Sequence, residues 1–328
     1  IEGGRFPAKA AIGETVIIEA DIFGDGHDSI DACLLYRPAG SEAWSEQPME
    51  FLVNDRWRTS IVFDENQMYQ FTLAGWRDLF GSWRKEVAKK FAAGINIELE
   101  LEEGRRMLDG AQGSERASDN DRRELASVLA AFGKLQDDRE KLGLLSSDAV
   151  ADLMKRSAVR TNYTQYERVL EIFVDRKIAA FSAWYSMFPR SQSGDPARHG
   201  TFNDVIGRLP YVRDLGFDVL YFTPIHPVGS TNKKGKNNSL QSTPEDPGSP
   251  YAIGAAAGGH EAIEPKLGTF EDFDRLVQAA AEHGLEIALD FAIQCSPDHP
   301  WIKEHPEWFD WRPDGSIRYA ENPPKKYE

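Results

Sequence analysis

From residue 181 onward, apolar runs alternate with helical patterns, and this alternation constrains the fold more than any other feature of the sequence. The apolar runs occupy residues 181–188, 217–224 and 285–290. A helical segment over 202–214 ends before Gly216, and an amphipathic segment over 270–283 is followed by Gly284. Near-continuous apolar strands that alternate with helices predict a parallel sheet or barrel, because helices cover both faces of such strands.

The beginning of the chain is predicted to form a β-sandwich. Short strand-like runs are separated by Gly, Pro, Asp and Asn, and they occupy residues 16–22, 32–37, 57–63 and 68–76. Short strands with such turns between them are typical of a sandwich. Strand-like sequence returns at 166–178, and the simplest architecture has this strand rejoin the sandwich. We therefore assign 1–83 and 159–180 to an immunoglobulin-like β-sandwich.

The segment 84–158 is predicted to be a helical domain inserted into the sandwich. It is rich in Glu, Arg, Ala and Leu, and apolar residues recur at helical spacing at positions 125, 128, 129, 132 and 135. Ser146-Ser147-Asp148 predicts the start of a further helix, and the small, polar residues of 110–120 predict a loop. The charged residues of this segment are most simply a solvated helix face, with partner binding as the alternative.

Composition excludes several classes of partner and site. The 328 residues include 53 acidic against 38 basic ones, a net charge of −15, which argues against binding to nucleic acid or to an anionic membrane. No apolar run approaches the roughly 20 residues of a membrane helix. The 2 cysteines, Cys33 and Cys295, cannot form a disulfide framework, so we expect a cytoplasmic protein. The sequence contains none of the usual zinc, P-loop or dinucleotide motifs, so we predict no metal and no cofactor.

Candidate binding residues follow the predicted strands, because function in a parallel barrel lies at the carboxyl ends of its strands. Those ends are 184–190, 223–227 and 290–295. Two cationic loops stand out in the acidic chain: Lys233-Lys234-Gly235-Lys236, and Lys325-Lys326 beside Asn322 and Tyr327. Lysine is a compact charge suited to phosphate, so the loops suggest an anionic small molecule. The alternative is that both are simply solvated lysine loops.

Several blocks of the sequence together resemble a known clan of enzymes. They are Trp184-Tyr185 with Phe188-Pro189-Arg190, and the segments 216–225, 268–273 and 289–290. In order and spacing they are similar to the α-amylase clan of (β/α)8-barrel enzymes, glycoside hydrolase family 13. Amylases carry Asp-x-x-x-Asn-His at the third strand, whereas here Gln294 and Cys295 follow Asp290. This variant, with the segments 233–238, 296–301 and 321–327, resembles one branch of the clan, the α-1,4-glucan:maltose-1-phosphate maltosyltransferase family.

The resemblance implies a retaining transfer of maltose from maltose 1-phosphate to an α-1,4-glucan, with release of phosphate. It implies that Lys234 and Gln294 contact the sugar phosphate, and that Asn322, Lys325 and Tyr327 help to bind the phosphate. It also implies a homodimer built through the N-terminal and helical parts. Asp290 is expected to organise the sugar subsite rather than to perform the chemistry.

The resemblance further implies that residues 181–328 are the first part of a (β/α)8 barrel, which takes about 250 residues when complete. In this family the nucleophile follows a fourth strand and the acid/base carboxyl follows a fifth. We therefore expect no catalytic residue within this chain, both carboxylates downstream of Glu328, and an inactive N-terminal piece of a longer enzyme.

Two alternatives stay open at this stage. The first is another enzyme of the α-amylase clan, trehalose-forming or hydrolytic, that uses no phosphate donor. The second is a non-catalytic role, in which the sandwich and its helices serve as a platform for dimerisation or for glucan binding.

Overall fold

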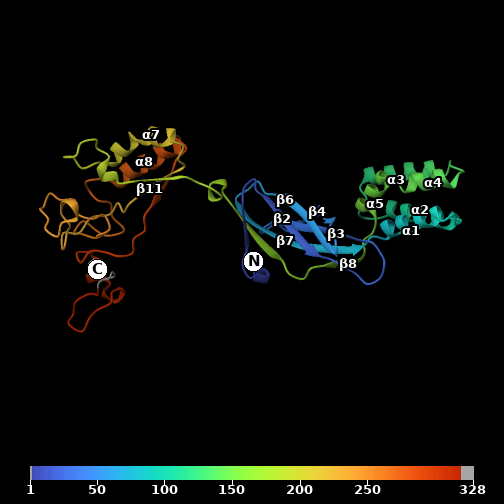
Figure 1. The fold of residues 1–328 in the computed structure, drawn as a ribbon, viewed down its shortest axis with the longest axis horizontal. Coiled ribbons are helices and arrows are strands. Elements are labelled where there is room, and N and C mark those ends of the chain that lie inside the picture. The colour runs from blue at the N-terminus through green and yellow to red at the C-terminus, as the bar shows by residue number, and fades with distance from the viewer. Residues whose placement is uncertain (1, 319–328) are drawn as a thin grey trace. The chain divides into compact units, whose positions relative to one another are not determined.

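The computed structural model describes residues 2–318 of the chain. The chain divides into two compact units, Ile1–Ala180 and Phe181–Glu328 (Figure 1). The first contains two β-sheets and a group of helices, and the second contains a parallel sheet with helices and long loops.

The first unit has two sheets. Its strands are β1 (Ala8–Ala11), β2 (Thr15–Asp21), β3 (Ile30–Pro38), β4 (Ser45–Pro48), β5 (Glu50–Phe51), β6 (Arg56–Val62), β7 (Gln67–Arg77), β8 (Thr161–Gln165) and β9 (Leu170–Asp175). The larger sheet has the order β1-β9-β7-β3-β4, with β8 also paired to β7, and the smaller has the order β2-β6-β5. Strand β9 pairs with β1 and β7, so the prediction that the later strand rejoins the earlier ones is confirmed.

A shared apolar core joins the two sheets. Along β6 buried and exposed residues alternate, so Ile61 faces inward beside Ile18 of β2. These side chains pack in one cluster with Leu34, Ile172 and Val174 of the larger sheet. Burial of one face of each sheet in this way is the main source of stability for packed sheets. The assignment of these sheets to the immunoglobulin-like class stays a prediction.

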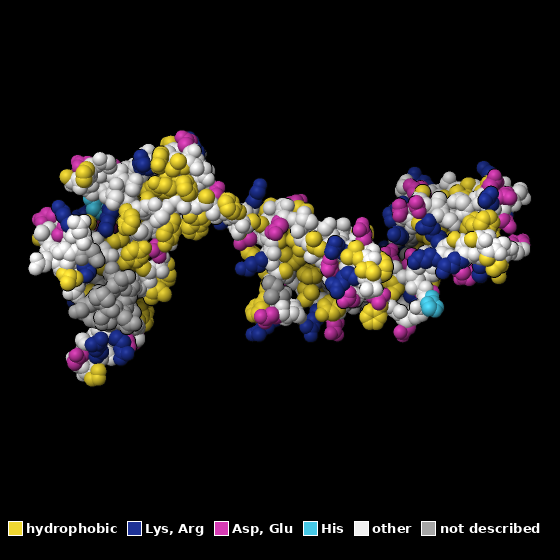
Figure 2. Space-filling model, in the orientation of Figure 1, with side chains coloured by type: hydrophobic (Ala, Val, Ile, Leu, Met, Phe, Trp, Pro, Cys, Tyr) yellow, Lys and Arg dark blue, Asp and Glu magenta, His cyan; other side chains and the backbone are white. Residues whose placement is uncertain are grey.

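The helices of the first unit have a core of their own. They are α1 (Leu79–Ala92), α2 (Glu98–Gln112), α3 (Asp119–Phe132), α4 (Asp138–Leu145) and α5 (Asp148–Ser157). Val87, Leu108, Leu125 and Leu145 are fully buried together in this core. Figure 2 shows charged side chains of both signs over the outside of these helices, as expected for a solvated face.

Helix caps account for the boundaries that the sequence predicted wrongly. The first helix begins at Leu79, before the expected residue 84, because the Asp78 carboxylate accepts a hydrogen bond from the Gly81 amide. The expected loop over 110–120 is shorter, because Ser118 and Asp121 form a capping box that starts α3 at Asp119. Ser147 caps α5, which confirms the predicted helix start.

The second unit contains a three-stranded parallel sheet of order β10-β11-β12. The strands are β10 (Trp184–Met187), β11 (Val219–Phe222) and β12 (Glu286–Leu289), and the helices are α6 (Phe202–Ile206), α7 (Leu209–Asp214), α8 (Phe270–Glu282) and α9 (Trp301–Glu304). The parallel sheet predicted from the alternating pattern is therefore confirmed. The single helix predicted over 202–214 is wrong, because Pro210 has no amide hydrogen to donate to Ile206 and the helix is interrupted.

Short 3-10 helices complete the fold at Glu2–Gly4, Lys177–Ala179, Pro189–Ser191, Lys236–Asn238 and Pro306–Trp308. Among residues 2–318, no helix is both long enough and apolar enough to cross a membrane.

Two glycines of α2 give a test of the helical core. A Cβ atom at Gly104 would lie 2.3 Å from Cζ2 of the buried Trp83 ring, whereas a Cβ at Gly110 would meet nothing within 4 Å. Alanine is favoured over glycine by about 1 kcal/mol in a helix, but overpacking a core costs about 1–3 kcal/mol. We expect Gly110→Ala to stabilise the first unit and Gly104→Ala to destabilise it, as measured by urea unfolding. Changes of the same sign in both variants would contradict this packing.

Candidate functional site

The ends of the first two parallel strands meet at one cavity of about 120 Å³. Pro189 and Arg190 reach it from the end of β10, and Thr223, Pro224 and His226 reach it from the end of β11. The carboxyl ends of these two strands therefore lie together at one cavity. Loops supply further lining residues, among them Lys233, Asp246, Glu264 and Lys266.

Three cationic side chains line this cavity in a strongly acidic protein. Burial lowers the pKa of the Arg190 guanidinium and the nearby Glu264 charge opposes this effect, but an arginine stays protonated at neutral pH. The ammonium of Lys233 donates a hydrogen bond to the carbonyl of Pro244 at 3.0 Å. The sequence analysis singled out Lys234, but it is its neighbour Lys233 that lines the cavity.

Lys234 itself is half-buried next to the cavity-lining Lys233. Within residues 2–318, its ammonium has no hydrogen-bond or ion-pair partner, so its charge is left for another group to balance. The chain turns sharply after it, because a Cβ atom at Gly235 would lie 2.1 Å from the carbonyl oxygen of Gln241. Lys236 follows in this turn with an exposed side chain.

Asp298 anchors the start of the lysine loop. Its carboxylate accepts hydrogen bonds from the backbone amides of Ser230 (2.6 Å) and Thr231 (2.7 Å) and from the hydroxyl groups of both residues. Burial raises the pKa of Asp298, but the hydrogen bonds from Thr231 and Ser230 outweigh this and hold it below the ordinary value. The carboxylate is therefore charged at neutral pH and fixes the loop to the segment after β12.

Asp290, at the end of the third strand, is held by hydrogen bonds from its surroundings. Its backbone amide donates to the Phe222 carbonyl at 2.9 Å, and the Tyr251 hydroxyl donates to its carboxylate at 2.7 Å. That hydrogen bond, with burial, raises the pKa of Tyr251 to about 12. Burial and a hydrogen bond to Asp290 also raise the pKa of Tyr221. The carboxylate thus holds two tyrosines at the strand end.

The remaining predicted residues lie apart from the cavity or outside the described chain. Gln294 is half-buried in the loop after β12 and is not among the residues that line the cavity. No hydrogen-bond partner of its side-chain amide occurs within residues 2–318. Asn322, Lys325 and Tyr327 lie outside the described residues.

A histidine pair, which sequence reasoning missed, fixes the loop that carries Gln294. Nε2 of His260 lies 2.7 Å from the carbonyl oxygen of Ala292, and a carbonyl only accepts, so Nε2 carries the proton. In the neutral imidazole Nδ1 is then an acceptor, and Nε2 of His299 donates to it at 3.1 Å. Nδ1 of His299 in turn accepts from the Trp301 amide at 3.1 Å. In this chain of hydrogen bonds the Trp301 amide donates to His299, His299 donates to His260, and His260 donates to the Ala292 carbonyl.

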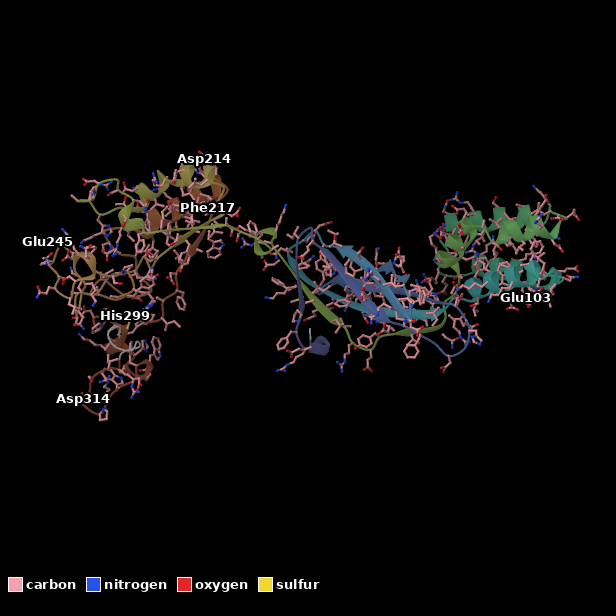
Figure 3. All side chains as sticks on the ribbon, in the orientation of Figure 1. Glu103, Asp214, Phe217, Glu245, His299 and Asp314 are labelled. Carbon is pink, nitrogen blue, oxygen red and sulfur yellow. The ribbon has the colours of Figure 1, made fainter. Side chains whose placement is uncertain are left out.

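The pair is enclosed by close packing (Figure 3 labels His299). The ring of Trp301 stacks on His260 with an interplanar angle of 10°. Cβ atoms at Gly254 and Gly259 would lie 2.5 Å and 2.1 Å from ring atoms of His299, so only glycine fits at both positions. In the sequence, the only indication of this close packing was the pair of glycines, Gly258-Gly259, directly before His260. Among residues 2–318, no group of three His, Cys, Asp or Glu side chains is placed to hold a metal ion.

Loss of the Asp298 carboxylate is expected to release the lysine loop. In Asp298→Ala the amides of Ser230 and Thr231 lose their acceptor, so their hydrogen exchange should speed up severalfold, since an amide exchanges when its hydrogen bond opens. Asp314→Ala is a matched control, because Asp314 accepts equivalent hydrogen bonds from Ser316 in another loop. Unchanged exchange at Ser230 and Thr231 in Asp298→Ala would disprove the anchor.

The histidine pair predicts an acid-sensitive loop. Burial first, and then the neighbouring His260, lower the pKa of His299. Because the folded state favours neutral His299, its contribution to stability is complete above the unfolded pKa of about 6.5 and is lost as the pH falls through the lower folded value. Nitrogen-15 NMR should show His299 still neutral, with the proton on Nε2, at a pH where a histidine peptide is half protonated. A His299 that is half protonated at or above that pH would refute the lowered pKa, and a neutral ring with its proton on Nδ1 would refute the tautomer assignment.

Two family models match the chain. Residues 1–176 match the model described as alpha-1,4-glucan:maltose-1-phosphate maltosyltransferase, domain N/S, and residues 186–327 match the alpha amylase catalytic domain. The parallel sheet of the second unit is therefore part of an amylase-type (β/α)8 barrel. A solved α-amylase from Lactobacillus plantarum shares 36% identity with this chain, covering 45% of it and 31% of the amylase, with a TM-score of 0.37.

Named relatives match from end to end of this chain. An alpha-1,4-glucan:maltose-1-phosphate maltosyltransferase of Cereibacter sphaeroides is 63% identical over 100% of the chain and 54% of its own length. The enzyme of that name from Chlorobaculum tepidum is 48% identical over 100% of the chain and 48% of its own length. The chain thus spans about half the length of the curated relatives it matches. On this evidence the chain belongs to the α-1,4-glucan:maltose-1-phosphate maltosyltransferase family.

Proposed function

We propose that the full-length protein transfers a maltosyl group from maltose 1-phosphate to an α-1,4-glucan and releases phosphate. The observation that carries this proposal is the half-buried Lys234 ammonium, which no described residue neutralises, in a loop that Asp298 holds in place. A phosphate leaving group needs such a positive charge, and the names of the relatives supply the donor and the acceptor.

The charges around Lys234 support a phosphate-bearing donor. Lys233, Arg190 and Lys266 line the neighbouring cavity at the ends of β10 and β11. Three cations against two carboxylates, Asp246 and Glu264, leave this lining net positive in a chain of net charge −15, which favours an anionic substrate. We assign phosphate binding to Lys234, with Asn322, Lys325 and Tyr327 as further phosphate ligands.

Gln294 is proposed to contact the sugar phosphate. An amide side chain both donates and accepts, so it can bind a sugar hydroxyl or a phosphate oxygen. The histidine pair supports this role, because it holds the carbonyl of Ala292 two residues earlier in the same loop. Asp290 organises the sugar subsite, as its hydrogen bonds with Tyr251 and Tyr221 support.

A retaining transfer needs a carboxylate nucleophile and an acid/base carboxyl about 5–5.5 Å apart. The proposal assigns donor binding to residues 1–328 and the two catalytic carboxylates to the rest of the full-length protein. It also assigns 1–83 and 159–180 to an immunoglobulin-like sandwich, 84–158 to an inserted helical domain and 181–328 to the first part of the barrel. The first helix begins upstream of the predicted helical segment, at Leu79.

The main alternative is a trehalose-forming or hydrolytic member of the α-amylase clan. An enzyme without a phosphate donor would not need Lys234, which has no hydrogen-bond or ion-pair partner among the described residues, for phosphate binding. The homodimer expected from the resemblance stays a prediction, which sedimentation of the full-length protein tests.

Substitutions in the full-length protein test the donor site. Lys234→Ala and Gln294→Ala should weaken binding of maltose 1-phosphate by roughly ten- to a hundredfold each, since a hydrogen bond to a charged group contributes about 1.5–3 kcal/mol. The measurements are phosphate release with a glucan acceptor and direct titration of the donor. Lys236→Ala is the matched control, because it removes an exposed lysine from the same loop. Unchanged affinity in Lys234→Ala and Gln294→Ala would favour an enzyme that uses no phosphate donor.

A further inference from the structure

The cavity at the ends of β10 and β11 is lined by an arginine whose charge no described residue balances. Arg190 is half-buried there. Its guanidinium carbon lies 5.9 Å from the centre of the Phe188 ring, but within residues 2–318 the group has no hydrogen-bond acceptor and no ion-pair partner. A guanidinium carries five N–H donors, and partial burial of such a charge is costly unless the donors meet acceptors. The arginine therefore favours an anion as its partner.

The backbone that carries Arg190 is fixed by a close contact. Its carbonyl accepts a hydrogen bond from the Gly200 amide at 2.7 Å. A Cβ atom at Gly200 would lie 2.4 Å from the carbonyl oxygen of Pro189, so only glycine permits this approach. A cation on a fixed backbone binds its partner at a lower cost in conformational entropy than one on a mobile loop.

Two lysines add to the positive charge of the cavity. The ammonium of Lys233 donates one hydrogen bond to the Pro244 carbonyl, which leaves two of its three donors for another group. Lys266 is exposed, and its ammonium has no partner within the described part of the chain.

The two carboxylates of the lining hold the surrounding loops. Asp246 accepts from the amide of Thr243 at 2.7 Å and from its hydroxyl at 3.2 Å. Glu264 accepts from the amides of Val228 at 3.3 Å and of Lys266 at 3.4 Å, and its charge acts on Arg190 without forming an ion pair with it. With the histidines neutral, three cations against two carboxylates leave the cavity positive.

The size of the cavity selects a small ion. Its volume of about 120 Å³ corresponds to about four water molecules at about 30 Å³ each. A tetrahedral oxyanion such as inorganic phosphate fits this space, whereas a disaccharide needs more room.

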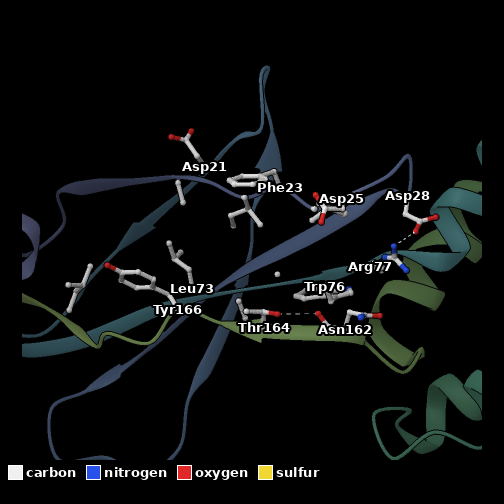
Figure 4. Close-up of a pocket in the computed structure, with 17 residues that line it drawn as sticks. Asp21, Phe23, Asp25, Asp28, Leu73, Trp76, Arg77, Asn162, Thr164 and Tyr166 are labelled. Atoms are coloured by element: carbon white, nitrogen blue, oxygen red, sulfur yellow. Dashed lines mark hydrogen bonds and ion pairs between the residues drawn. The ribbon is translucent and has the colours of Figure 1, made fainter.

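The larger groove of the first unit does not offer the same charge. It has a volume of about 770 Å³ and lies between the segment after β2 and the strands β7 and β8 (Figure 4). Arg77, the one cation that lines it among the described residues, pairs with Asp28 at 3.0 Å. Of these two sites, the cavity beside Arg190 is therefore the one suited to an anion.

We propose that this cavity binds inorganic phosphate through Arg190, Lys233 and Lys266, separately from the phosphate group of the donor. The planar guanidinium can bind two phosphate oxygens at once. The proposal rests on the proposed function for the source of the ion, because phosphate is the product of that transfer. A phosphate here brings negative charge to Lys233, the neighbour of Lys234 in sequence, and so opposes binding of the anionic donor. Donor binding is thereby coupled to the concentration of the product.

Titration calorimetry with inorganic phosphate on the full-length protein tests the cavity. The protein carries Lys234→Ala, which weakens the proposed phosphate position of the donor, and it should still bind phosphate. Addition of Arg190→Gln should lower the remaining affinity by about tenfold, and Arg190→Lys should lower it less because the charge is kept. Arg208→Gln is the matched control, since it removes an exposed arginine of the same unit that does not line the cavity.

Three results would overturn the phosphate cavity. The first is loss of all phosphate binding in Lys234→Ala alone. The second is an affinity that Arg190→Gln leaves unchanged or that Arg208→Gln lowers equally. The third is an equal loss of affinity for maltose 1-phosphate when Arg190→Gln is the single substitution, because the cavity would then hold the phosphate of the donor.

The test remains decisive if Arg190→Gln does not fold. Lys266→Gln changes an exposed side chain and should lower the phosphate affinity severalfold, and an unchanged affinity in it would then overturn the cavity. Failure of the proposed function is a separate result: it would appear as absence of phosphate release from maltose 1-phosphate in the unsubstituted protein, whereas the phosphate titration requires no turnover.

Discussion

The candidate site depends on one buried turn, Ser296–His299, and on the hydrogen bonds that it makes. Ser296 bonds through its backbone amide to Ile253 and through its hydroxyl to Gly254. Asp298 holds the start of the lysine loop, and His299 acts through His260 on the loop after β12. Three loops, none of them part of a sheet, are thereby fixed relative to one another. Fully satisfied networks of this kind rigidify a site, whereas an unsatisfied member would destabilise it.

This construction supports the donor site that we propose. The strands bring Arg190 and Thr223 to one edge of the sheet, but the lysines come from a loop with little regular structure. Asp298 orients that loop through backbone amides and hydroxyl groups, and within residues 2–318 the ammonium of Lys234 stays unpaired. The loop is therefore held in place without loss of the charge that a phosphate requires.

The first unit is stabilised by apolar cores of its own. Its two sheets bury one core, and its helices bury another around Val87 and Leu108. Both cores are closed by apolar packing, and Phe23 of the same unit is 73% exposed.

The sequence by itself determined the parallel strands after residue 181, the strand that rejoins the first sheet, and the family, because all three follow from local periodicity and from motif order. The cap at Asp78 and the break at Pro210 are also local, so closer attention to side-chain capping and to proline would have corrected both boundaries. Only the tertiary structure decided that Lys233 lines the cavity and that His260 meets both His299 and Ala292. Those histidine contacts join residues 39 and 32 positions apart. No periodic pattern specifies such pairs, since packing of the whole unit brings them together.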